Sequence, residues 1–148
     1  MKCTSCNPSG GNNLITETKF WIVTLSSKQE YLGRCYVTLK RHCGSLSELT
    51  LEEWENFAVV VEQLEAACKK SLSAVMFNWT CLMNMAYQEK PPQPHVHWHF
   101  RPRYDHDVMI LDTQFVDPEF GHHYSRDRKQ IVNPKVSREI IAKIKAHL

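Results

Sequence analysis

The sequence predicts an α+β domain in which one long helix packs on an antiparallel sheet. Two short apolar, β-branched segments, residues 19–25 (KFWIVTL) and 33–39 (GRCYVTL), have the composition of buried strands. A helical pattern follows over residues 51–70, and residues 95–100 (HVHWHF) then alternate with a period of two. Consecutive strands joined by short connections favour antiparallel pairing, which places this chain in the α+β class.

The first two strands and the helix follow one another along the chain. Residues 26–30 form the turn of a predicted hairpin, and Ser47 or Thr50 then serves as the helix N-cap, with two glutamates in the first turn. Two lysines suit the negative carboxyl end of the helix. Apolar positions recur at helical spacing and predict the face that packs on the sheet: Leu51, Trp54, Phe57, Ala58, Val61, Leu64 and Cys68.

Two more strands and a terminal helix complete the prediction. Residues 74–86 (AVMFNWTCLMNMA) form a third strand, and a proline-rich loop leads into the histidine strand. Residues 137–148 fit a short amphipathic helix. We expect one domain over residues 1–148, with a core at about 15–104 and an irregular extension over 105–148.

Composition limits the classes of function. The chain has 148 residues, of which 43% are hydrophobic, so it can bury a core without disulfides. Its formal charge of +2, without a long basic run, leads us to expect no nucleic-acid partner and no membrane partner. The beginning of the sequence, MKCTSCNPSGGNN, lacks the apolar stretch of a secretory signal, which favours a cytoplasmic location.

The histidine strand carries the clearest functional signal. His95, His97 and His99 project from one face of a strand, and the apolar and aromatic residues between them face the core. Three aligned imidazoles leave six ring nitrogens to satisfy, which favours a site over ordinary packing. A metal site made by all three histidines is one alternative at this point.

Three histidines alternating with apolar residues, followed by an apolar residue, Pro and Arg, resemble the defining motif of the histidine triad superfamily of nucleotide hydrolases and transferases. Residues 31–53 (YLGRCYVTLKRHCGSLSELTLEE) resemble that family's strand, basic turn, histidine and helix start, and the similarity covers about residues 15–104. Residues 86–106 and 117–124 (DPEFGHHY) look like a bacterial branch. The resemblance implies a sheet of about five strands and a homodimer.

The resemblance also implies an activity. His97 would attack the α-phosphorus of a dinucleoside polyphosphate or a nucleoside phosphoramidate and carry the nucleotidyl group, and His99 would support it by hydrogen bonding. Asn84 occupies a position where members carry a polar side chain, and Arg101 suits phosphate. Ser26 stands where many members hold ribose with a carboxylate or amide.

The loop before the triad departs from the family pattern, because Lys90 and three prolines replace small residues and a polar step. Gln93 is the residue in this loop that we expect to take over part of the missing polar role. A zinc-stabilised nucleotide-binding module with weak catalysis therefore remains an alternative function.

A structural zinc site is the predicted cofactor. Cys3 and Cys6 have the C-x-x-C spacing with which two thiolates grip one zinc ion. The resemblance implies His42 and His95 as the other two ligands, while Cys43 beside His42 is an alternative third ligand. An exposed C-x-x-C without metal is the competing interpretation.

A second polar cluster lies downstream of the triad. We expect it to be a solvated surface or a dimer contact rather than part of the active site: His122, His123, Arg126 and Arg128.

Overall fold

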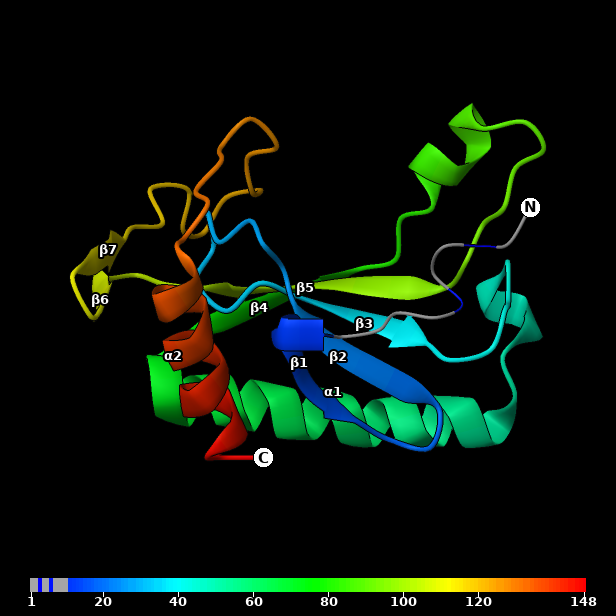
Figure 1. Cartoon of the computed structure of the whole chain (residues 1–148), viewed down its shortest axis with the longest axis horizontal. Coiled ribbons are helices and arrows are strands. Elements are labelled where there is room, and N and C mark those ends of the chain that lie inside the picture. The colour runs from blue at the N-terminus through cyan, green and yellow to red at the C-terminus, as the bar shows by residue number, and fades with distance from the viewer. Residues whose placement is uncertain (1–2, 4–5, 7–10) are drawn as a thin grey trace.

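The computed structural model describes residues 3, 6 and 11–148 and confirms the predicted fold class (Figure 1). Five antiparallel strands form one sheet in the order β1-β2-β3-β5-β4. The helix α1 (Leu51–Leu72) runs along one face of this sheet. The strands are β1 (Leu14–Glu17), β2 (Trp21–Leu25), β3 (Cys35–Leu39), β4 (Met76–Thr80) and β5 (His97–Arg103).

Helix α1 begins after Thr50, one of the two predicted caps. The Thr50 hydroxyl accepts from the Glu53 N–H, and the Glu53 carboxylate accepts from the Thr50 N–H, so both form a capping box. The predicted apolar face is displaced by part of a turn. Leu51 is 81% exposed and Ala58 is also exposed, whereas Val60 is among the buried residues. The predicted face is therefore correct at Phe57, Leu64 and Cys68, which are buried, and wrong at Leu51 and Ala58.

Strand β5 lies between β3 and β4, so it is paired on both sides. Val96 and Phe100 are fully buried, and Trp98 stacks on Phe57 of α1 with ring centroids 4.8 Å apart. Because alternate residues of a strand face opposite sides, the histidines between them point away from α1. The alternation in the sequence therefore predicts correctly which face of this strand is core.

The predicted third strand is too long. Strand β4 ends at Thr80, and Asn84–Gln88 form a short 3₁₀ helix instead. Residues 82–94, which we call the arm, rise from the sheet as a separate projection (Figure 1). Met, Ala and Gln in this stretch favour helical backbone, which apolar content alone does not distinguish from strand.

Residues 105–148 are more regular than predicted. They contain a hairpin of β6 (Val108–Ile110) and β7 (Thr113–Phe115), and then helix α2 (Pro134–Lys145), which starts three residues earlier than expected because Asn133 caps it. Helix α2 buries its apolar side next to α1 and β1. Among the described residues, no helix is long and apolar enough to cross a membrane.

Candidate active site

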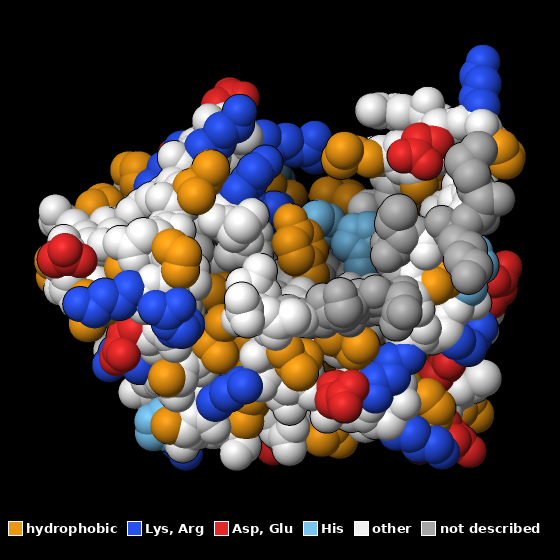
Figure 2. Space-filling model, viewed as in Figure 1, with side chains coloured by type: hydrophobic (Ala, Val, Ile, Leu, Met, Phe, Trp, Pro, Cys, Tyr) orange, Lys and Arg blue, Asp and Glu red, His pale blue; other side chains and the backbone are white. Residues whose placement is uncertain are grey.

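A cleft of about 1160 Å³ opens on the face of the sheet that α1 leaves free. Its walls are the arm on one side and residues 124–129 on the other, with His97 and His99 between them. Figure 2 shows histidine side chains inside a hollow, with Lys and Arg side chains gathered along one rim. The cleft therefore combines imidazoles with positive charge, a combination suited to anionic groups.

The hydrogen bond of His97 fixes which nitrogen is free. Its Nδ1 lies 2.8 Å from the carbonyl oxygen of His95. A carbonyl oxygen only accepts, so Nδ1 carries the proton and Nε2 carries the lone pair in the neutral ring. The backbone of β5 thus holds His97 in the tautomer that a nucleophile needs.

His99 lies beside His97, with ring centroids 4.9 Å apart, and 5.1 Å from the ring of Tyr36. Burial first, and then the positive charges of His97, Arg101 and Arg34, together lower the pKa of His99 to about 4. His99 is consequently neutral at pH 7. It can offer one N–H to a phosphate oxygen without carrying a charge of its own.

Two thiols and two imidazoles meet beside the cleft. The ligand atoms of Cys3, Cys6, His42 and His95 all lie within 4.8 Å of one another. The Cys6 sulfur is 3.2 Å from His42 Nδ1, and the Cys3 sulfur is 3.5 Å from His95 Nδ1. Two sulfur and two nitrogen donors are a set that tetrahedral zinc prefers.

The orientation of His95 suits a metal ligand. Its Nε2 donates to the Leu39 carbonyl oxygen at 2.7 Å, so Nδ1 presents its lone pair to the cysteines. Burial lowers the pKa of His95, which keeps the ring neutral as coordination requires. The Cys43 thiol instead donates to the Ser45 carbonyl oxygen at 3.2 Å, so the alternative third ligand points elsewhere.

The geometry does not favour the alternative of one metal shared by all three triad histidines. His95 turns both ring nitrogens away from His97, one to Leu39 and one to the cysteines. Among residues 3, 6 and 11–148, the group with Cys3 and Cys6 is the one metal-ligating cluster found. His97 and His99 are left for other chemistry.

The predicted substrate residues divide into two groups. Asn84, Gln93 and Arg101 all line the cleft, Asn84 and Gln93 from the arm and Arg101 from β5. Ser26 does not: it is 3% exposed, and its hydroxyl accepts from the Lys28 N–H at 3.2 Å inside a turn. The expectation that Ser26 contacts substrate is therefore corrected, because this turn points the side chain into the protein.

The sequence analysis missed one wall of the cleft. Arg126 and Arg128 line it, contrary to the prediction that they lie apart from the active site. Tyr124 packs under the Arg101 guanidinium, 4.0 Å from ring centroid to carbon. The RDRK run at residues 126–129 was the available signal, but only the fold brings it back over the histidines.

The fold and the triad define a class of protein: the chain has the histidine triad fold. No protein-family model and no curated protein sequence matches the chain. Solved structures do match. A histidine triad protein from Sinorhizobium meliloti superposes with a TM-score of 0.70 at 17% identity, covering 91% of this chain and 88% of that one.

Two further solved structures match the fold. A zinc-bound histidine triad family protein from Mycobacterium smegmatis has a TM-score of 0.64 at 19% identity, covering 99% of this chain and 95% of that one. Diadenosine triphosphate hydrolase from Plasmodium falciparum has a TM-score of 0.62 at 14% identity, covering 92% and 76%. At these identities the similarity establishes the fold, and chemistry must be argued from the residues of this chain.

Proposed function

We propose that this protein is a nucleotide hydrolase or transferase that acts on an α-phosphate through a nucleotidyl intermediate on His97. The observation that carries the proposal is the His97 Nδ1 to His95 carbonyl hydrogen bond, which leaves the Nε2 lone pair for attack. The similarity to a diadenosine triphosphate hydrolase and to other histidine triad structures supports the same reaction class.

The reaction has two displacements. His97 Nε2 forms a bond to the α-phosphorus, and the bond from phosphorus to the leaving oxygen or nitrogen breaks, with its electron pair going to the leaving group. Water then attacks the phosphorus and gives up one proton to the solvent, while the bond from phosphorus to His97 Nε2 breaks and its electron pair returns to Nε2. The products are a nucleoside monophosphate and neutral His97. Neutral His99, which lies beside His97, stabilises an equatorial oxygen by donating a hydrogen bond.

We propose zinc as the structural cofactor, held by Cys3, Cys6, His42 and His95. All four positions are protein side chains, so the ion would tie Cys3 and Cys6 to the loop after β3 and to the residues just before β5, and supply no open coordination site. Similarity to a zinc-bound histidine triad protein supports this proposal. A homodimer and a cytoplasmic location are retained as predictions.

The test is release of AMP from diadenosine tetraphosphate and from adenosine phosphoramidate. We expect turnover by the wild type and a loss of about 1000-fold or more in His97→Ala, because the nucleophile is gone. His147→Ala, which changes an exposed histidine outside the cleft, is the matched control and keeps full activity. Rapid quenching should recover an acid-labile adenylyl group on the peptide that contains His97.

Turnover that survives in His97→Ala would overturn this mechanism. Tight binding of AMP without turnover of either substrate would favour the second candidate, a zinc-stabilised nucleotide-binding module. One observation favours that candidate: Ser26 is turned inward, so the ribose contact expected at this position is absent.

A further inference from the structure

The cleft carries more positive charge than one phosphate requires. Its lining includes seven lysine and arginine side chains but only two carboxylates, although the whole chain has a net charge of only +2. The cations are concentrated on the side opposite the arm: Lys28, Arg34, Arg101, Arg126, Arg128 and Lys129. Such a concentration of one sign in a concave site attracts a multiply charged anion.

Two of these cations are already neutralised. Arg34 is paired with Glu30, and Arg128 is paired with Glu119 at 3.0 Å. The other four have no carboxylate within 4 Å among the described residues, and we call them the basic wall: Lys28, Arg101, Arg126 and Lys129. Arg101 is 6% exposed, so it is a largely buried guanidinium that donates a single long hydrogen bond, 3.4 Å to Thr80. A buried, uncompensated cation indicates a missing anion.

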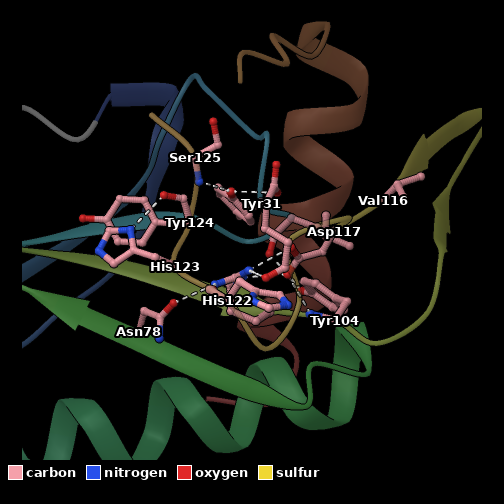
Figure 3. A network of polar contacts seen from close by, with 12 residues as sticks. Tyr31, Asn78, Tyr104, Val116, Asp117, His122, His123, Tyr124 and Ser125 are labelled. Atoms are coloured by element: carbon pink, nitrogen blue, oxygen red, sulfur yellow. Dashed lines mark hydrogen bonds and ion pairs between the residues drawn. The ribbon is translucent and has the colours of Figure 1, made fainter. Parts of the chain in front are cut away.

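The basic wall is held in place by contacts that reach far along the chain. The hydroxyl of Tyr31 accepts from the Ser125 N–H at 2.8 Å (Figure 3). The Gln29 backbone N–H donates to the Gln130 carbonyl oxygen at 2.7 Å. These bonds fasten the segment with Arg126 and Lys129 beside the turn with Lys28. The wall is therefore a fixed surface of the cleft, which reduces the entropic cost of binding a ligand.

The basic wall lies beyond the triad rather than on it. Arg101 is four residues after His97 on the same face of β5, which corresponds to about 13 Å along a strand. The long Arg101 side chain and the residues of the 124–129 segment can shorten this distance but cannot all contact the phosphate at His97. They are positioned for a second anionic group of the same ligand.

We infer that the basic wall binds a second phosphate group, in addition to the phosphate attacked by His97, so that nucleotides with two phosphates are preferred over those with one. The inference rests on the proposed function for the first phosphate. The second phosphate can be next in the chain, as in ADP, or on the ribose, as in adenosine 3′,5′-bisphosphate. Both present the same dianionic chemistry to Arg126 and Lys129.

The experiment measures the dissociation constants of AMP, ADP, adenosine 3′,5′-bisphosphate and inorganic pyrophosphate by titration calorimetry. We expect at least one of the two diphosphorylated nucleotides to bind about tenfold more tightly than AMP, a difference of about 1.4 kcal/mol. Whichever binds more tightly identifies the position of the second phosphate. The preference should shrink as salt is raised, since exposed charges are screened.

The double variant Arg126→Ala, Lys129→Ala tests the wall itself. Both side chains are exposed and, among the residues that the structure describes, make no hydrogen bond or ion pair, so the variant is expected to melt like the wild type. It should lose the tenfold preference and keep its affinity for AMP. The matched control, Lys135→Ala with Arg138→Ala, removes the same charge from exposed positions of α2 and should keep the preference.

Equal affinity for AMP and both diphosphorylated nucleotides, or a preference that survives in the double variant, overturns the inference. These results do not depend on turnover. A protein that binds pyrophosphate through the wall but hydrolyses nothing contradicts the proposed function and supports the wall. A protein that hydrolyses substrate without preferring a second phosphate supports the proposed function and contradicts the inference about the wall.

Discussion

The two ends of strand β5 differ in how completely their polar groups are bonded. At its end, the buried Arg103 uses all five N–H donors: they reach the Asp117 carboxylate twice, the Asn78 side chain, and the carbonyl oxygens of Glu119 and His122 (Figure 3). At its start, His97 bonds the backbone through one nitrogen and leaves the other free. We call the Arg103 end saturated, because all its hydrogen-bond donors are used, and it stabilises the fold. We call the His97 end unsaturated, because one ring nitrogen is free, and it is available to a ligand.

This difference shows how one strand serves two purposes. A group whose donors are all satisfied inside the protein contributes to stability but has nothing to offer a substrate. A group with an unused lone pair can react but contributes little to folding. The two kinds of residue therefore predict opposite outcomes of mutation, and the four predictions below test that opposition.

The largest effect on stability is expected at the saturated end. In Arg103→Met the Asp117 carboxylate stays buried without its partner, which costs about 3–5 kcal/mol of unfolding free energy. Urea unfolding measures the change. Arg138→Met, at an exposed position of α2, is the control and should change stability by less than about 0.5 kcal/mol. If Arg103→Met lost no more unfolding free energy than Arg138→Met, the idea that the fully bonded Arg103 side chain stabilises the fold would be refuted.

Metal removal tests whether His95 Nδ1, which faces the two cysteines, is a metal ligand. If zinc joins this nitrogen to Cys3 and Cys6, free zinc at a hundred times its Kd adds about 2.7 kcal/mol to the free energy of unfolding. A strong chelator should remove this contribution and lower Tm by roughly 5–10 °C. Cys3→Ser should have a lower Tm and respond little to chelator. Cys43→Ser is the control, because its thiol faces Ser45, and it should respond like the wild type. An unchanged Tm in chelator would argue against the zinc site.

A smaller effect is expected from the titration of His99. Its pKa of about 4 in the folded protein lies below the ordinary 6.5, so between these values the unfolded chain binds a proton that the folded chain does not. Protonation of the unfolded chain at His99 therefore costs no unfolding free energy above pH 6.5, and it lowers the free energy of unfolding as pH drops from 6.5 toward 4. We expect His99→Gln to reduce the stability lost between pH 7 and pH 5 by about 1 kcal/mol, after allowing for solvent screening.

Urea midpoints at the two pH values give this difference, and His147→Gln, which changes an exposed histidine, should leave it unchanged. If His99→Gln and the wild type lost the same unfolding free energy between pH 7 and pH 5, the fold would not be holding His99 neutral.

The smallest effect on stability is expected at the unsaturated end. His97→Ala removes the nucleophile, yet the side chain is only half-buried and makes one hydrogen bond. We expect the free energy of unfolding to change by less than about 0.5 kcal/mol while activity is lost. Thermal melting and AMP release on the same sample separate the two readouts. A destabilisation as large as that of Arg103→Met would remove the contrast on which this comparison is based.

Local patterns were sufficient for the parts of the fold whose signal is local. The alternation around His97 identifies both faces of β5. The capping pattern narrows the start of α1 to Ser47 or Thr50, because each signal depends on residues a few positions apart, and the structure selects Thr50. Strand β1 escaped because four residues with one buried side chain give too little alternation to recognise.

The candidate site was predictable where a motif carries the chemistry. Cys3 and Cys6 are close in sequence, and the family resemblance supplied His42 and His95, whose ligand atoms lie with the two sulfurs within 4.8 Å of one another. Arg101 was predicted as a substrate residue, but the rest of the basic wall, Lys28, Arg126 and Lys129, was missed for a physical reason. Its segment is anchored by pairs such as Tyr31 with Ser125, which lie 94 residues apart, and no local rule encodes a contact at that separation.

The strand order has a consequence for how the chain is made. Strand β5 is inserted between β3 and β4, and it pairs Phe100 with Cys35 across a long stretch of intervening sequence. A nascent chain that has emerged only as far as β4 therefore exposes the unpaired edges of two strands at once. Such edges are templates for association with other chains, so residues 97–103 complete the sheet as well as supplying its histidines.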